Sequence, residues 1–173
     1  MNSLLHRYAL FATVLFPSLV LSLAFSQNES RVIDVPGAPL EIISYSARYT
    51  EGGSYSTEGI QQAVTVRNAA GQGVVALGIG FHAFDAFKRY MGRPLTGIAI
   101  FELPSDGEST RMTWTQRPTA SFTFEDYGIG VAFVRIVRFE DGTIWEADMD
   151  HVLGELQEIE DSLALEDIQE EHE

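Results

Sequence analysis

The 173-residue sequence contains no cysteine, which excludes disulfide bonds, a thiol nucleophile and lipid attachment to an N-terminal cysteine. A domain without disulfides must be stabilised by its apolar core, and a chain of this length buries about two thirds of its unfolded surface. Basic residues are also scarce, because 11 Lys and Arg stand against 25 Asp and Glu. We therefore predict that the chain, which has a net charge of −14 and no basic stripe, does not bind nucleic acid.

Long apolar runs are absent except near the N-terminus. There, His6 and Arg7 precede an apolar run over residues 9–25, which is typical of a secretory signal peptide. Small residues at positions 24 and 26 predict cleavage before Gln27, so that residues 1–26 are the signal peptide; cleavage after Ala24 and an uncleaved anchor are the alternatives. We expect a periplasmic or secreted protein that is not a lipoprotein and has no stable membrane insertion after cleavage.

Acidic residues are concentrated at the C-terminus, where residues 146–173 hold 12 Asp and Glu and no Lys or Arg. Within this segment, apolar residues spaced by three and four predict the seam of an amphipathic helix: Met149, Val152, Leu156, Ile159 and Leu163. We assign 149–173 to an acidic amphipathic helix and a disordered tail that begins at 166. The seam either folds back on the preceding domain or docks on another chain, which makes Leu156 and Ile159 candidate partner contacts.

Between these ends, residues 27–148 form one predicted domain in which apolar residues recur with period two, the pattern of half-buried strands. The segment 74–83 is apolar on both faces, as expected of a central strand, and Gly78 and Gly80 leave room for close approach. Strands are predicted at 40–50, 60–68, 74–83, 96–101, 109–115, 120–125, 129–140 and 143–147. An all-β fold follows, either a β-sandwich of about seven or eight strands or, as the alternative, a small eight-stranded β-barrel.

Two local patterns give sharper predictions. Asp141-Gly142 between two alternating runs predicts a two-residue type I′ hairpin turn that places Phe139 opposite Ile144. Aromatic residues recur every three positions at Phe81, Phe84, Phe87 and Tyr90, which predicts a helical turn that closes at Gly92. These rings either plug the open end of the sandwich or present a surface patch for a partner or for sugar rings, so Phe84, Phe87 and Tyr90 are candidate contacts.

The sequence contains no complete motif for catalysis, cofactor binding or metal binding. Residues 71–76, Gly-Gln-Gly-Val-Val-Ala, match a dinucleotide-binding fingerprint, but a β-branched run follows where the fingerprint needs a helix N-terminus. Outside the first 26 residues and the acidic C-terminal segment, His82 is the only histidine, and no G-x-S-x-G motif occurs. The acidic residues at 146, 148 and 150 lack the spacing of a calcium loop. We predict a non-enzyme with no cofactor and no metal site.

A resemblance supports the fold and leaves the function open. The residues that carry it are Phe84-Asp85-Ala86-Phe87, Tyr90-Met91-Gly92, Trp114 before Pro118, and the run Val134 to Trp145. Together they resemble a group of uncharacterised bacterial exported proteins with an immunoglobulin-like sandwich, over about residues 60–148. The resemblance implies that sandwich and export, but no activity.

Three classes of function follow from these observations. The first is a non-catalytic protein-interaction module of the cell envelope or exterior, whose partner is an unknown protein. The second is a small-ligand or glycan-binding module that uses the aromatic rings. The third is a hydrolase of unrecognised type, which would need His82 near a carboxylate and a hydroxyl.

Overall fold

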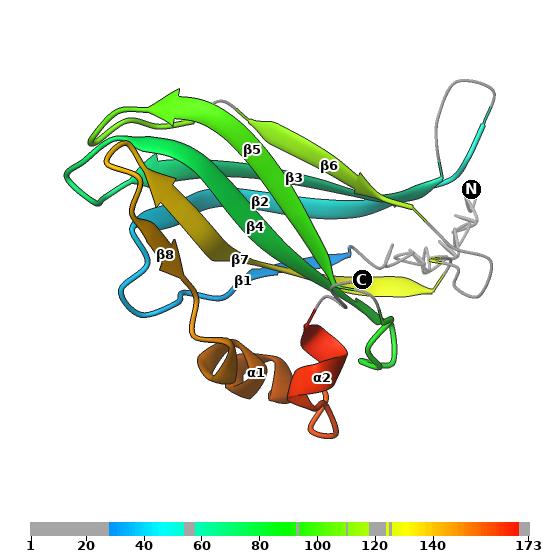
Figure 1. Cartoon of the computed structure of the whole chain (residues 1–173). Helices are drawn as coiled ribbons and strands as arrows, with labels where there is room; N and C mark the ends of the chain where they lie inside the picture. The colour runs from blue at the N-terminus through cyan, green and yellow to red at the C-terminus, as the bar shows by residue number, and fades with distance from the viewer. Residues whose placement is uncertain are drawn as a thin grey trace, which may run out of the picture.

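The protein is mostly β, with two separate sheets rather than the closed barrel of the alternative prediction (Figure 1). The computed structural model describes residues 28–53, 58–92, 94–109, 111–117, 124 and 126–169. The five-stranded sheet contains β1 (Glu29–Val32), β7 (Tyr127–Phe139), β4 (Val74–Asp85) and β5 (Leu95–Leu103) in that order, with β8 (Ile144–Glu146) also beside β7. The three-stranded sheet contains β2 (Leu40–Thr50), β3 (Gly59–Asn68) and β6 (Met112–Gln116).

Most neighbouring strands are antiparallel, as expected for alternating segments joined by short loops. The exception is β1, which runs parallel to β7 and pairs residues 29–32 with 129–132. The sequence patterns predicted seven of these eight strands, one of them from a run that is apolar on both faces, but not β1, whose four residues are mostly polar and exposed. The predicted strand at 120–125 lies almost entirely outside the described residues.

The main core lies between the two sheets. Leu77, Ile79 and Phe81 of β4 pack there with Val64 and Val66 of β3, and all five are at most 2 % exposed. The predicted close approach at the two glycines of β4 is confirmed, because the ring of Phe133 lies 2.3 Å from where a Cβ on Gly80 would be. A larger residue there would displace that ring.

A second core lies on the outer face of the five-stranded sheet, which is the face turned away from the three-stranded sheet. Its cover is α1 (Met149–Gln157) and α2 (Leu165–Ile168), seen beneath the sheet in Figure 1. The side chain of Asp148 caps α1 by accepting a hydrogen bond from Asp150 N at 3.0 Å. Val152 and Leu156 are fully buried against the sheet, so the apolar seam folds back on its own domain.

The C-terminal segment differs from the prediction in length and extent. The helix ends at Gln157 rather than continuing to 163, and a turn leads into α2. Within the segment predicted to be a disordered tail, Ile168 is fully buried in the second core. Ile168 is a single apolar residue among acidic ones, so no periodic spacing in the sequence predicted its burial.

The loop of the β7–β8 hairpin has three residues, so the prediction of a two-residue turn was wrong. Phe139 N donates to Thr143 O and Gly142 N donates to Phe139 O, both at 3.0 Å. Gly142 has φ of +85°, whereas Asp141 does not have a positive φ, which excludes a type I′ turn. The Asp141 carboxylate instead accepts the N–H of Thr143 at 2.9 Å, and Arg138 rather than Phe139 lies opposite Ile144.

The predicted helical turn after residue 81 was also wrong. Strand β4 continues to Asp85, and the chain returns through a tight turn that pairs Phe84 with Tyr90. Asp85 fixes this turn, because its carboxylate accepts hydrogen bonds from Phe87 N at 2.8 Å and Arg89 N at 2.9 Å. Spacing of three in a strand sends Phe81 and Phe84 to opposite faces, where each joins a different core.

Candidate functional site

The aromatic residues that the sequence singled out do not form one exposed patch. Phe84 is fully buried under the helices and packs against Tyr90, with ring centroids 5.4 Å apart. Phe87 is 77 % exposed at the tip of the turn, where the guanidinium of Arg89 lies 5.4 Å from its ring centroid. A single exposed ring beside a cation provides little surface for stacking a sugar or docking a partner.

His82 is built into the second core. Its Nδ1 lies 2.9 Å from the Tyr90 hydroxyl, and its ring stacks on Phe133 at an angle of 3°. Burial, followed by the charge of Arg135, lowers the pKa of His82 to about 3, so the imidazole is neutral at ordinary pH. Among the described residues no carboxylate hydrogen-bonds to it, so the arrangement that a hydrolase would need is not formed there.

The two candidate residues from the apolar seam lie at different depths. Leu156 is fully buried against the five-stranded sheet, and Ile159 is partly exposed in the turn after α1. Leu156 therefore offers no surface to another chain while the helix is in place. Whether Ile159 contacts a partner stays a prediction.

Among the described residues, three of the five exposed large apolar side chains lie on one surface of the outer face of the five-stranded sheet, outside the area that the helices cover. It is formed by five aliphatic residues of four strands, here called the aliphatic patch: Ala76, Ile98, Ile100, Ile136 and Ile144. Ile100 is 84 % exposed, Ile144 is 58 % exposed and Ile98 is 57 % exposed. Gly78 lies beneath them, since methyl groups of Ile136 and Ile98 come within 2.6 and 3.2 Å of where its Cβ would be.

A bulge explains why this surface is aliphatic. Between the pairs that β7 makes with Gly78 and Ile79 there is one extra residue, Arg135. The bulge reverses the alternation, so that Val134 packs in the main core while Ile136 lies on the outer face. Large exposed aliphatic clusters are unusual on monomeric proteins and commonly mark a contact surface.

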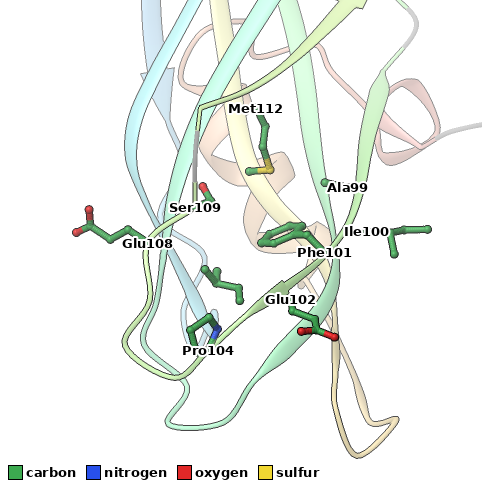
Figure 2. Close-up of a pocket in the computed structure, with 9 residues that line it drawn as sticks. Ala99, Ile100, Phe101, Glu102, Pro104, Glu108, Ser109 and Met112 are labelled. Carbon is green, nitrogen blue, oxygen red and sulfur yellow. The ribbon is translucent and has the colours of Figure 1, made fainter.

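A cleft opens on the other side of β5, between this edge strand and a wall formed by Pro104, Glu108, Ser109 and Met112. Figure 2 shows Phe101 and Met112 turned toward the cleft, while Ile100 points away from it. The volume is about 490 Å³, and the lining is apolar at the floor with two carboxylates at the rim: Ala99, Ile100, Phe101, Glu102, Leu103, Pro104, Glu108, Ser109 and Met112. Strand β5 thus carries the cleft on one face and the aliphatic patch on the other.

The walls of the cleft are fixed by hydrogen bonds, so the cleft is preformed. Buried Asn68 donates from Nδ2 to the carbonyl oxygens of Leu103 and Pro104 at 3.3 and 3.0 Å. Across the cleft, Ser109 exchanges two hydrogen bonds with Val66, at 2.8 and 2.9 Å. Preformed apolar hollows with a few polar groups at the rim are the common form of binding sites.

The edge of β5 is only partly closed. In the described sheet β5 has a strand neighbour on one side, β4. The indole ring of Trp114 lies over Gly97 and donates from Nε1 to Ile98 O at 3.3 Å, which covers the beginning of the strand. The cleft opens where this cover ends, from Ala99 onward.

The sequence pattern did not single out this site, although one signal was present. In β5 both alternating sets of residues are apolar, Ile98 and Ile100 on one face and Ala99 and Phe101 on the other. Such a strand is expected at the centre of a sheet, yet β5 lies at the edge. A strand that is apolar on both faces and lies at an edge therefore exposes one apolar face. Strand order, which the pattern does not give, is the missing information.

Within the described ranges no group of three or more His, Asp or Glu side chains is placed to hold a metal ion. No helix of that part of the chain combines the length and the apolarity needed to cross a membrane.

Comparison with known proteins adds little to this description. No family model and no curated protein matches the chain. A hypothetical protein from Peptoclostridium difficile 630, solved by X-ray crystallography at 1.85 Å, aligns with 68 % of this chain and 91 % of its own at 12 % identity. The TM-score of that alignment is 0.36, too low for any inference about fold or function.

Proposed function

We propose that this chain is an exported, non-catalytic protein-interaction module of the cell envelope or exterior, built on an immunoglobulin-like sandwich. The observation that carries the proposal is the aliphatic patch, where Ile98, Ile100 and Ile144 are more than half exposed beside an edge strand. Burying such side chains contributes roughly 1.5–3 kcal/mol each, which favours a protein partner with an apolar surface.

The connectivity of the strands supports the immunoglobulin-like assignment. Strands β2 and β3 pair in one sheet, β4 and β5 in the other, β6 returns to the first sheet, and β7 and β8 complete the second. The sheets β2-β3-β6 and β5-β4-β7-β8 thus have the order of strands A-B-E facing C′-C-F-G in immunoglobulin-like domains. Strand β1, parallel to β7, is an addition to this plan.

Export is supported by the sequence before Gln27, where a charged start, an apolar run and small residues at positions 24 and 26 are typical of a secretory signal peptide. N-terminal sequencing of the protein purified from its native host tests it. We expect the mature chain to begin at or near Gln27. An intact Met1 in a membrane fraction would contradict the export proposal.

A glycan-binding or hydrolytic function has less support. The rings that would stack on a sugar are divided between the second core and one exposed position, Phe87. His82 is buried and neutral, with a hydroxyl as its hydrogen-bond partner. The cleft beside β5 has two carboxylates but among its described lining residues no histidine or lysine.

Site-specific photo-cross-linking in the native host tests the interaction module. A photoreactive residue placed at Ile100 should give one defined adduct, and the same residue at Phe87, which is 77 % exposed against 84 % for Ile100, provides the matched control. Replacing Ile98 and Ile144 with Asp should remove the adduct at position 100 without unfolding the domain. Equal labelling at both positions, or none at position 100, would contradict the proposal.

A further inference from the structure

We infer that the partner contacts β5 through an extended peptide segment that places one bulky apolar side chain in the Phe101–Met112 cleft and a Lys or Arg beside Glu102. This inference rests on the proposed interaction module and names the chemistry of its partner. Three features of the described residues carry it: the shape of the cleft, the charge at its rim and the open edge of β5.

The shape of the cleft suits a side chain rather than a flat surface. Phe101 and Met112 lie at the apolar floor of the cleft, and its volume of about 490 Å³ has room for a Leu, Phe or Trp side chain. The hydrogen bonds of Asn68 and Ser109 hold both walls before any ligand arrives. Binding therefore costs little ordering of the site, which is how a short segment gains affinity.

The charge at the rim selects a cation. Glu102 makes no ion pair with any described residue, and it also lines a second hollow of about 480 Å³ together with Glu140. Glu108, on the opposite rim, already pairs with Arg67 at 2.8 Å. Glu102 and Glu140 are both exposed, so a Lys or Arg placed between them would reduce their mutual repulsion.

The same charge argues against a second copy of this chain as the occupant. Another copy would bring a net charge of −14 and its own Glu102 toward this rim. Like charges across an interface slow association and lower affinity. A partner segment that carries Lys or Arg instead gains from the long-range attraction of the whole chain.

The open part of the β5 edge, from Ala99 to Leu103, has room for a short extended segment only. Trp114 closes the edge up to Ile98, and the pairing with β4 is irregular between Ile100 and Leu103, where two residues of β5 oppose one of β4. Such a bulge discourages long strand addition. The side chain in the cleft, rather than a long ladder of backbone hydrogen bonds, must therefore supply most of the specificity.

The probe for a test is the capped peptide acetyl-Gly-Lys-Leu-Phe-Lys-Gly-amide, titrated into the ¹⁵N-labelled protein purified from its native host and followed by amide chemical shifts. Two matched peptides accompany it, one with both Lys replaced by Glu and one with Leu-Phe replaced by Ala-Ala. We expect shifts confined to residues 98–112 with the first peptide, and at least tenfold weaker binding for each matched peptide. Equal binding of the acidic peptide, or shifts centred on α1 and α2, would overturn the inference.

Two variants of the protein sharpen the result. Glu102→Gln should weaken binding of the basic peptide about threefold to fivefold, the size of one partly screened ion pair. Glu155→Gln removes the same charge from the exposed side of α1 and should leave binding unchanged. An equal effect of both variants would show that only net charge matters, which contradicts a site at the rim.

The outcomes also separate this inference from the proposed function. A defined cross-link at position 100 without peptide binding would overturn the basic, extended partner while leaving the interaction module standing. Shifts at residues 98–112 that depend on protein concentration alone would identify a second copy as the occupant and would likewise overturn the inference. Absence of both the cross-link and peptide binding would overturn the interaction module itself.

Discussion

The outer face of the five-stranded sheet has two halves that both carry large apolar side chains but differ in exposure. In the half under the helices, Phe84, Val131 and Phe133 are at most 1 % exposed. In the other half, Ile98 and Ile100 are 57 and 84 % exposed. The apolarity of a sheet face is therefore not what decides its burial. What decides it is where the chain after β8 comes to lie, and α1 and α2 pack on one half only.

The largest difference between the two halves is expected when one large aliphatic side chain is truncated on each. Leu156→Ala removes a fully buried side chain from the cover and should lower the free energy of unfolding by about 2–5 kcal/mol. Ile100→Ala removes an 84 % exposed side chain and should change it by less than about 0.5 kcal/mol. Urea unfolding of both variants provides the measurement. Similar losses from the two variants would show that the halves are not different in the free protein.

The covered half should also respond to acid, through His82. Its folded-state pKa is lowered to about 3, so the unfolded chain takes up a proton below about pH 6.5 while the folded protein does not. The stability associated with neutral His82 is therefore complete above pH 6.5 and decreases as pH falls toward 3, by about 2 kcal/mol at pH 5. His82→Gln should remove this part of the pH dependence in urea unfolding between pH 7.5 and 5. An unchanged slope would mean that His82 takes up its proton at the same pH in the folded protein as in the unfolded chain, which contradicts its burial as a neutral ring.

A smaller effect on stability is expected in the β7–β8 hairpin. Gly142 has φ of +85°, and this turn carries Ile144 to the patch and leads the chain to α1. Gly142→Val forces a β-branched residue into that conformation and should cost at least about 1 kcal/mol. A thermal melt compared with that of the parent protein measures it. A variant that melts at the parent temperature would contradict the turn geometry.

The smallest expected effect is a gain in stability from a substitution in α1, which covers one half of the sheet. Gly154 lies within α1 on its exposed side, and a Cβ there would meet nothing within 4 Å. Gly154→Ala should raise the free energy of unfolding by about 0.5–1 kcal/mol, because alanine loses less backbone entropy in a helix. Gly71→Ala, in a turn with φ of +72° and equally open space, should not be stabilising and provides the matched control. A gain of equal size from both variants would contradict the helical origin of the effect.

The sequence allowed the elements to be predicted better than their arrangement. Alternating apolar residues and one doubly apolar run located seven of the strands, and the spacing of Val152 and Leu156 located the covering helix. Strand β1 was missed because its pairing with β7 uses backbone groups and leaves polar side chains outside. The cleft and the patch were missed because both depend on β5 being at an edge, and on a bulge at Arg135 that turns Ile136 outward. Local sequence patterns indicate neither the position of a strand in its sheet nor the place of a bulge.

Amide hydrogen exchange along β5, measured on the free protein and on the complex isolated through the cross-link at position 100, shows directly whether the exposed half of the sheet is the contact surface. Partner binding should slow exchange at residues 98–103, while exchange in α1 stays as it is in the free protein. Slower exchange in α1 or at residues 84–92, with β5 unchanged, would show that the exposed half of the sheet is not the contact surface.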